Sequence, residues 1–345
     1  MKKIVAIMMI MALVLSLGTL ALAEGETYKI GCLVWKFNDT FGSSVRNAME
    51  KYCAELGEAN GITIEWNAVD ANDVMATQIE QAPTIFAQSD LVIINLADVS
   101  AGEALIEIAS EYPDVPFFFY NKQPSADTEQ AVLVEPDTMF VGTLARQAGD
   151  MQGEILADLY AADPSIDTNG DGILQYVVFM GEPANDEAQA RSKYCVETAE
   201  ACGLTLEPVV DTIVANWDTA QAQEAMTAAW AANGDKIEVV FCNNDDMAIG
   251  VIAALNEAGY NTGIEGDPEI VVIGVDRTDT ALEYIKNGML TATVQQDADA
   301  MAKANIQIAI NKLLGKDWLE GTGYEFTTED AFKCIRIPYA KITEA

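Results

Sequence analysis

The chain of 345 residues contains no histidine. This absence excludes Ser-His-Asp and Cys-His catalytic groups, and also the usual zinc sites with histidine ligands. Basic residues are scarce as well, since 19 Lys and Arg stand against 54 Asp and Glu and leave a net charge of −35. Such an acidic surface repels nucleic acids and anionic membranes, and we expect neither as a partner. Solubility in a salty exterior is a sufficient explanation for the charge.

After the N-terminus, no apolar run is long enough to span a bilayer. The N-terminus itself is typical of an export signal, with two lysines before an apolar run over residues 4–20 and the cleavage motif Ala21-Leu22-Ala23. The sequence therefore predicts a signal peptide at residues 1–23 and a periplasmic or extracellular mature chain. An uncleaved membrane anchor is the alternative. No Cys follows the cleavage motif, so a lipoprotein anchor is not indicated.

The six cysteines of an exported chain could pair as disulfides. However, Cys32, Cys53 and Cys242 lie within apolar strand or helix patterns. Cys195 and Cys202 stand on one predicted helix at a separation of roughly 10 Å in rise, which is too far for a bridge. We expect free, buried thiols, and a Cys32–Cys53 bridge is the alternative.

Segments with strand and helix patterns alternate along the chain. Strands are predicted at residues 28–34, 62–69, 91–95, 115–120, 174–180, 204–210, 237–242 and 270–275, and helices at 41–56, 74–88, 101–111, 143–161, 187–201, 219–232, 247–258 and 278–287. The strands are apolar on both faces, which indicates parallel sheets covered by helices on both sides.

A mature chain of about 320 residues is long for a single core. The two halves also resemble each other, since Asn60-Gly61-Ile62-Thr63-Ile64-Glu65 closes the first strand–helix unit and Cys202-Gly203-Leu204-Thr205-Leu206-Glu207 closes its counterpart. We therefore predict an α/β fold of two doubly wound parallel-sheet lobes joined by a hinge. No helix-turn-helix precedes them, so a DNA-binding repressor of this architecture is not expected.

One loop has the pattern of a calcium site. Side-chain oxygens stand at positions 1, 3, 5 and 9 of the segment (Asp167, Asn169, Asp171 and Gln175), Gly172 at position 6 suits the sharp bend, and Ile173 offers its carbonyl at position 7. An EF-hand would add a bidentate Glu at position 12, where this chain has Val178. The missing carboxylate has a candidate in Glu238, the single acid of an apolar strand. The alternative is a surface turn without a metal.

Short polar side chains follow several predicted strands, where ligands bind in open parallel sheets. Asp39, Asn121, the run Asn243-Asn244-Asp245-Asp246 and Asp276 occupy such positions. Each could simply cap the next helix. Their repetition in both halves favours a cleft lined by planar amides and carboxylates, which suits a ligand covered in hydroxyl groups.

Two aromatic residues accompany these polar groups, Phe41 and Trp217. A pyranose has apolar C–H faces and a polar rim, so rings above and below it with planar polar groups at the edge would match it. Packing in the core or at a helix start is the alternative for each ring.

Several motifs in order resemble those of the bacterial periplasmic D-galactose/D-glucose-binding proteins, the substrate-binding components of sugar ABC importers. They are Trp35-Lys36-Phe37-Asn38-Asp39-Thr40-Phe41, Asn121-Lys122-Gln123-Pro124-Ser125, Gly181-Glu182-Pro183, Trp217-Asp218-Thr219-Ala220-Gln221-Ala222, Lys236-Ile237-Glu238-Val239-Val240, Asn243-Asn244-Asp245, Gly274-Val275-Asp276 and Ile335-Arg336-Ile337-Pro338-Tyr339. The resemblance spans nearly the whole mature chain and implies a periplasmic binding protein of type I.

The resemblance implies the sugar contacts and the domain boundaries. Phe41 and Trp217 would enclose the ring, and its hydroxyls would be held by Asp39, Asn121, Arg191, Asn244 and Asp276. The family's calcium ligands match Asp167, Asn169, Asp171, Ile173, Gln175 and Glu238. The first lobe would comprise residues 24–143 and 296–333 and the second 144–295 and 334–345, with crossings near Thr143, near Gln296 and just before Arg336.

Three cleft positions depart from the family. Its His and Asp after Gly-Glu-Pro are Asn185 and Glu187 here, and its Asn near the late strand is Gln296. Each of the two longer side chains adds one methylene, about 1.5 Å, which narrows the cleft or moves a contact.

The leading hypothesis is a non-enzymatic, monomeric receptor that closes around a hexose such as glucose or galactose, or a smaller sugar, and docks on an importer permease. Calcium would hold a loop without taking part in chemistry. The same fold could instead report to a chemoreceptor or sensor kinase. A third hypothesis is a secreted glycoside hydrolase with Asp39 and Glu187 as its paired carboxylates, although the Arg beside them favours binding.

Overall fold

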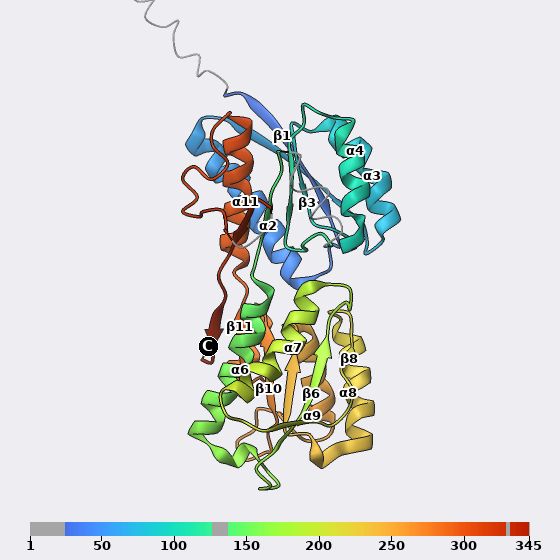
Figure 1. Cartoon of the computed structure of the whole chain (residues 1–345), viewed down its shortest axis with the longest axis vertical. Helices are drawn as coiled ribbons and strands as arrows, with labels where there is room; N and C mark the ends of the chain where they lie inside the picture. Colours follow the sequence, from blue (N-terminus) through green and yellow to red (C-terminus); the bar gives the residue numbers. More distant parts are fainter. Residues whose placement is uncertain (1–24, 126–136, 329–331, 345) are drawn as a thin grey trace, which may run out of the picture.

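The computed structural model describes residues 25–125, 137–328 and 332–344. They form two lobes stacked along the long axis of the molecule (Figure 1). The predicted export signal lies outside these residues. Within the described part, no helix combines the length and apolarity needed to cross a membrane.

The first lobe is built on a six-stranded parallel sheet in the order β12-β5-β4-β3-β1-β2. Its strands are β1 (Thr27–Val34), β2 (Thr63–Asp70), β3 (Leu91–Ile94), β4 (Phe117–Tyr120), β5 (Phe140–Gly142) and β12 (Cys334–Arg336). Helices α2 (Thr40–Asn60) and α11 (Ala298–Leu313) pack on one face, and α3 (Met75–Gln88) and α4 (Gly102–Ser110) pack on the other.

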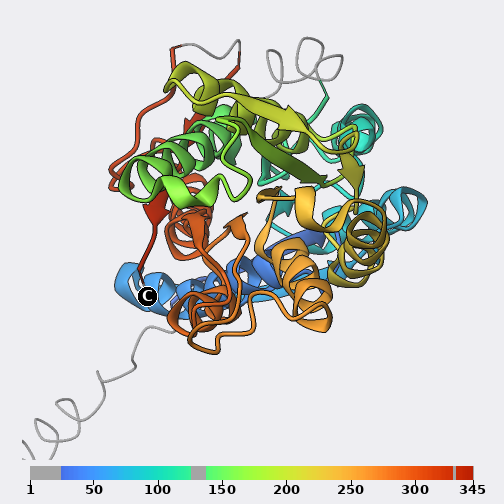
Figure 2. The same ribbon diagram turned by 90° about the horizontal axis from the view of Figure 1, so that it is seen from below.

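The second lobe repeats this arrangement with the order β13-β11-β10-β9-β6-β7, and β8 also pairs with β6. Its strands are β6 (Leu174–Met180), β7 (Leu206–Pro208), β8 (Ile213–Val214), β9 (Val239–Cys242), β10 (Val271–Val275), β11 (Ala292–Gln295) and β13 (Ala340–Ile342). Helices α6 (Ala145–Ala162) and α7 (Asp186–Ala201) cover one face, and α8 (Thr219–Asn233), α9 (Asp245–Glu257) and α10 (Asp279–Lys286) cover the other (Figure 2). The prediction of two doubly wound α/β lobes is confirmed.

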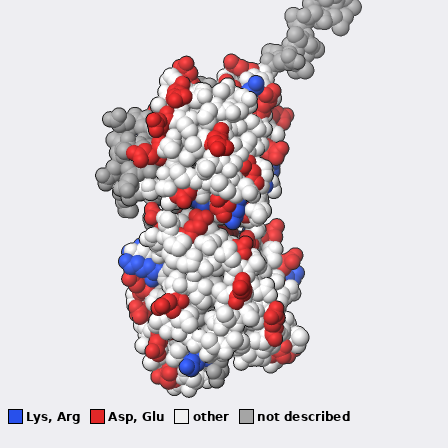
Figure 3. Space-filling model, turned by 90° about the vertical axis from the view of Figure 1, so that its right-hand side faces the viewer, with Lys and Arg blue, Asp and Glu red and all other residues white. Residues whose placement is uncertain are grey.

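Buried strands explain why the sequence has continuous apolar runs. Every residue of β3, β4, β9 and β10 is buried, because helices cover both faces of each sheet. One strand departs from the parallel prediction, since β13 runs antiparallel to β11 at the sheet edge. The outside is acidic, and Figure 3 shows Asp and Glu over both lobes of one face, with charges of both signs at the waist between them.

The chain crosses between the lobes after β5, after β11 and after β12. The first two crossings lie beside Thr143 and Gln296. The predicted third crossing, just before Arg336, is wrong, because Cys334–Arg336 pairs with β5 as part of the first-lobe sheet. Burial of Cys334 and Ile335 in that lobe explains the pairing, and the chain crosses after Arg336 instead.

All six cysteines are unpaired. Five of them are buried as predicted, but Cys202 is exposed. The difference has a local cause, since Cys202 is the residue that caps the C-terminus of α7, where the chain leaves the packed helix.

Candidate functional site

A cavity between the lobes collects the predicted ligand-binding residues. It is lined by Trp35, Asp39, Phe41, Asn121, Lys122, Asn185, Glu187, Arg191, Trp217, Asn244, Asp276 and Gln296. All ten residues that the sequence nominates for a sugar are in this set. The lining residues come from both lobes.

Asp39 enters the cavity from the end of β1, as the N-cap of α2. Its Oδ2 accepts a hydrogen bond from the Gly42 backbone N–H at 2.6 Å, and the residue is buried. Burial raises the pKa of this carboxyl, while the Gly42 N–H and the charge of Lys36 oppose the shift. The capping bond holds the carboxyl in place, so the capping interpretation and the ligand-binding interpretation of Asp39 are compatible.

Asp276 lies across the cavity, directly after β10. Burial raises its pKa well above the usual range, and the nearby Arg191 guanidinium acts in the opposite direction. Its backbone φ is 123°, and Asn121 and Trp217 also have positive φ values of 62° and 64°. Strained backbone of this kind persists where the surrounding fold imposes it and is frequent at binding sites.

Phe41 and Trp217 form apolar walls from opposite lobes. Phe41 belongs to the core of the first lobe, on α2, whereas Trp217 precedes α8 in the core of the second. Trp217 is held close to the backbone of Gly181, because a Cβ at residue 181 would lie 2.2 Å from its ring. The indole Nε1 of Trp217 is buried without a partner among the described residues.

Arg191 supplies the positive charge at the centre of the site. Its Nη1 donates to the Asn243 carbonyl, and its Nη2 lies 2.7 Å from both Glu187 Oε2 and Gln296 Oε1. Burial acts to lower the pKa of this guanidinium, but Tyr339, Glu187 and Asp276 outweigh it and the group stays charged. The buried Nε has no partner among the described residues.

The three positions that depart from the family line the cavity with polar groups already engaged by the protein. Asn185 caps α7, with Oδ1 accepting from the N–H of Glu187 at 2.8 Å. Glu187 Oε1 accepts from the Thr143 hydroxyl, in addition to the contact of Oε2 with Arg191. Gln296 Nε2 donates to Asn121 Oδ1 at 3.1 Å. The longer arms of Glu187 and Gln296 therefore reach protein groups at the hinge.

Sequence reasoning missed two residues of the cavity, Trp35 and Lys122. Lys122 is 4% exposed, and its Nζ lies 3.4 Å from the centroid of the Trp35 ring. Burial lowers the pKa of Lys122, and Glu182 opposes that shift. Both missed residues lie within the quoted motifs, Trp35 shortly before Asp39 and Lys122 directly after Asn121. Each follows the end of a predicted strand, and this position could have identified them.

The lobes touch each other around this cavity. The Thr40 hydroxyl on α2 donates to the Asp246 carboxylate on α9 at 2.7 Å. Trp35, from the first lobe, belongs to the same buried apolar cluster as Trp217 and Phe179 of the second. The structure thus represents a closed arrangement, in which a ligand would be surrounded on both sides.

The predicted calcium loop lies at the far end of the second lobe, between α6 and β6. Glu238, which is 2% exposed, reaches the loop from the start of β9, and its Oε1 accepts from the N–H of Thr168 at 2.7 Å. Asn169 Nδ2 donates to Gln175 Oε1, and Gln175 Nε2 donates to Asp171 Oδ2. The distant Glu and the loop oxygens are thus brought together.

The kinds of side chain in this loop determine which metal ion it suits. Among the described residues, no three Asp, Glu, Cys or His side chains converge closely enough to hold a metal by themselves. The loop instead offers carboxylates together with amide oxygens of Asn169 and Gln175 and the Ile173 carbonyl, which is the mixture that Ca²⁺ prefers. The residues present fit that ion.

Comparisons with known proteins identify the family of this chain. Residues 30–317 match the family described as periplasmic binding protein domain. The chain is 31% identical over 346 residues to the D-galactose/methyl-galactoside binding periplasmic protein MglB of Haemophilus influenzae, covering 99% of this chain and 97% of that protein. It is 25% identical over 292 residues to the ribose import binding protein RbsB of Bacillus subtilis, covering 84% and 83%.

Solved structures of low identity share the fold. An ABC transporter solute binding protein from Bacillus halodurans with bound myo-inositol has a TM-score of 0.71 at 23% identity and covers 93% of this chain and 95% of its own. A periplasmic solute binding protein from Actinobacillus succinogenes with bound D-allose has a TM-score of 0.72 at 19% identity, with 92% and 98% covered.

Proposed function

The chain belongs to the periplasmic binding protein family, and we propose that it is an extracytoplasmic, monomeric receptor that delivers a monosaccharide to an ABC importer. The observation that carries the proposal is the closed cavity between Phe41 and Trp217, whose rim bears the carboxylates of Asp39 and Asp276. Carboxylates accept hydrogen bonds from hydroxyl groups, and Arg191 donates hydrogen bonds to hydroxyl oxygens. Such charge-assisted hydrogen bonds are stronger than neutral ones. Two flat rings on opposite lobes match the two apolar faces of a pyranose.

A hexose of the glucose or galactose type is the ligand we propose. The relative with 31% identity is named for galactose. The motif resemblance also implies that Asp39, Asn121, Arg191, Asn244 and Asp276 hold sugar hydroxyls. Glu187 and Gln296 are engaged by the protein, so they leave the ligand fewer free polar partners than their position alone would predict. A pentose is the alternative, supported by the ribose-binding relative.

Calorimetry with a panel of monosaccharides tests the proposal. We expect one site per chain, with affinity for a hexose lost in both Asp39→Ala and Trp217→Ala. Asp90→Ala, a change in the first lobe that does not touch the cavity, is the matched control for Asp39→Ala and should bind as the unmodified chain does. Undiminished affinity in both cavity variants would show that the ligand binds elsewhere.

We propose a structural calcium site in the second lobe, held by Asp167, Asn169, Asp171, Gln175, Glu238 and the carbonyl of Ile173. The ion would be held by carboxylate, amide and carbonyl oxygens together and would fix the loop between α6 and β6. The loop follows α6 and lies away from the cavity, so removal of calcium should lower stability more than sugar affinity. Titration with Ca²⁺ after treatment with a chelator tests the site, and absence of a calcium isotherm would refute it.

Two other readings have direct tests. A sensor that presents its closed form to a chemoreceptor or sensor kinase would use the same cavity and differ only in its partner. Binding of the closed form to a chemoreceptor or sensor kinase, and not to the permease, would favour the sensor hypothesis.

A glycoside hydrolase would need Glu187 as a free acid or base, but Arg191 and Thr143 already occupy its two oxygens. Sustained release of phenol from aryl glycosides would overturn the receptor proposal.

A further inference from the structure

The three segments that cross between the lobes meet at one side chain, Arg191. Its Nη2 lies 2.7 Å from Gln296 Oε1 in the second crossing and 2.7 Å from the Tyr339 hydroxyl in the third. The first crossing joins through Glu187, which contacts Arg191 at 2.7 Å and also accepts from the Thr143 hydroxyl. One guanidinium that lines the ligand cavity is thereby connected to every segment of the hinge.

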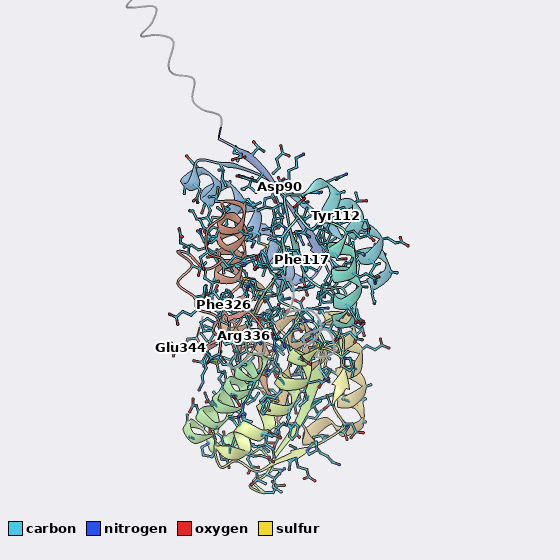
Figure 4. All side chains as sticks on the ribbon, turned by 45° about the horizontal axis from the view of Figure 1, so that its top comes forward. Asp90, Tyr112, Phe117, Phe326, Arg336 and Glu344 are labelled. Atoms are coloured by element: carbon cyan, nitrogen blue, oxygen red, sulfur yellow. The ribbon has the colours of Figure 1, made fainter. Side chains whose placement is uncertain are left out.

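Further hydrogen bonds, outside the cavity, join the third crossing directly to the first. The Tyr339 hydroxyl donates to Thr143 Oγ1 at 2.9 Å, which joins the third crossing to the first. Arg336 adds a second link, since its Nη1 donates to the Thr143 carbonyl at 2.7 Å and it lies where the two lobes meet (Figure 4). Thr143 is 2% exposed and Tyr339 is 5% exposed, so water does not compete for these bonds.

Arg191 Nη2 has fewer hydrogens than it has oxygen neighbours. Nη2 carries two hydrogens but faces three oxygens at 2.7 Å, those of Glu187, Gln296 and Tyr339. The three contacts therefore share two protons, and a change in any one of them alters the other two. Neither Thr143 nor Tyr339 lines the cavity.

From this arrangement we infer that Thr143 and Tyr339 are positioning residues for ligand binding, which couple occupancy of the cavity to closure of the hinge through Glu187 and Arg191. They stabilise the closed arrangement of the crossings without touching the ligand. The inference rests on the proposed function for the identity of the ligand, but not for the mechanics of the hinge. Glu187 and Gln296, the longer arms of this chain, supply the reach that the connection requires.

The coupling has a signature that a ligand contact cannot produce. When a binding-competent closed form is only partly populated, apparent affinity for every ligand falls by the same factor. Loss of a hinge bond should therefore weaken two epimeric sugars equally. Loss of a contact to one hydroxyl would instead change the ratio of their affinities.

Four single variants test this by calorimetry with two epimeric hexoses. Tyr339→Phe and Thr143→Val each remove one hydroxyl and should weaken both sugars about tenfold, with their affinity ratio unchanged within about twofold. Thr143→Ser keeps the hydroxyl and should bind both sugars as the unmodified chain does. Tyr28→Phe, which removes an exposed hydroxyl whose one hydrogen bond among the described residues is to Glu26 at 2.9 Å, is the matched control and should have no effect.

Either of two results would overturn the inference: unmodified affinity in both Tyr339→Phe and Thr143→Val, or an effect confined to one epimer. Cooperative thermal unfolding of each ligand-free variant separates misfolding from hinge effects. If the unmodified chain binds no sugar of the panel, the proposed function fails while the hinge remains testable by small-angle X-ray scattering. Tyr339→Phe and Thr143→Val should then increase the radius of gyration of the ligand-free protein relative to Tyr28→Phe, and equal radii would refute the coupling.

Discussion

The ammonium group of Lys122 lies 2.9 Å from the carboxylate of Glu182, although the two residues belong to different lobes. Lys122 follows β4 in the first lobe, and Glu182 follows β6 in the second. The side chain of Lys122 is 5% exposed and that of Glu182 24%, so the pair is largely shielded from solvent. The Trp35 ring covers the ammonium from the other side. Opening of the lobes would separate the charges, so the pair favours the closed form.

Removal of this pair should weaken ligand binding. We expect Lys122→Met and Glu182→Gln each to reduce sugar affinity about tenfold, and the double variant to lose less than the product of the two, since close charge pairs are coupled. The matched control is Lys193→Met, which disrupts an exposed i,i+4 pair with Glu197 and should change affinity by less than twofold. Calorimetry of all four variants measures the coupling, and strictly multiplicative effects would refute an interaction between the lobes.

Addition of one methyl group at Gly181 should displace Trp217. A Cβ there would meet the indole at 2.2 Å, which no real contact permits, so the ring must leave its position on the wall of the cavity. We expect Gly181→Ala to abolish measurable sugar binding. Far-ultraviolet circular dichroism should remain unchanged, because the backbone of β6 is not altered. Sugar affinity within twofold of the unmodified chain would show that the position of the ring does not matter.

Asp245 should make the ligand-free protein less stable as pH rises from about 4 to about 7. Burial raises its pKa from 3.8 to about 7, although Thr293 Oγ1 and the Thr278 N–H donate to its carboxylate at 2.6 and 2.7 Å. In that interval the unfolded chain ionises while the folded carboxyl keeps its proton, so the free energy of unfolding falls. The contribution is at most about 4 kcal/mol.

Asp245→Asn removes this titration while keeping the side-chain shape. The decrease in stability between pH 4 and 7, measured by urea denaturation, should be smaller in the variant than in the unmodified chain. Parallel pH profiles for the unmodified chain and Asp245→Asn would contradict the assignment.

A change of one carboxylate in the calcium loop should reduce the stabilisation by calcium. In Asp171→Asn, Oδ1 can still accept from the Ile173 N–H, whereas the bond that Gln175 Nε2 donates to Oδ2 is lost together with one charge. Calcium at 100 times its dissociation constant stabilises by about 2.7 kcal/mol, or roughly 5 °C in the thermal midpoint. We expect Asp171→Asn to lose most of that shift in differential scanning fluorimetry.

Asp163→Asn is the control for the calcium experiment. It removes the same charge one short 3-10 turn before the loop, and Asn replaces Asp well as a helix cap. The shift on addition of calcium should persist in this variant. Equal shifts in Asp163→Asn and Asp171→Asn would place the ion elsewhere.

Much of the fold could be predicted from the sequence. The long strands β1 and β6 and the helix α2 have clear periodicity, and the polar residues that follow strands lie at one cavity because parallel strands end at the same edge of a sheet. Five short strands were not predicted, namely β5, β8, β11, β12 and β13, which have two to four residues each. Helix α11 escaped because Asn305 and Asn311 interrupt its buried face.

The partners of the polar groups in the cavity were beyond sequence reasoning. The family resemblance assigns Glu187 and Gln296 to the ligand, but it does not reveal that these side chains also reach Thr143 and Asn121. The bonds of Tyr339 depend on where the third crossing leaves the first-lobe sheet. That point is set by the pairing of β12 with β5, which connects residues nearly 200 positions apart.

That pairing also governs how the polypeptide acquires its native form. Neither lobe is a continuous piece of chain, because β12 completes the sheet of one and β13 the sheet of the other within the last dozen described residues. Removal of the last dozen residues would therefore leave one unpaired edge on each sheet, open to pairing with another molecule. Both sheets can therefore be completed only after the C-terminal segment has been synthesised.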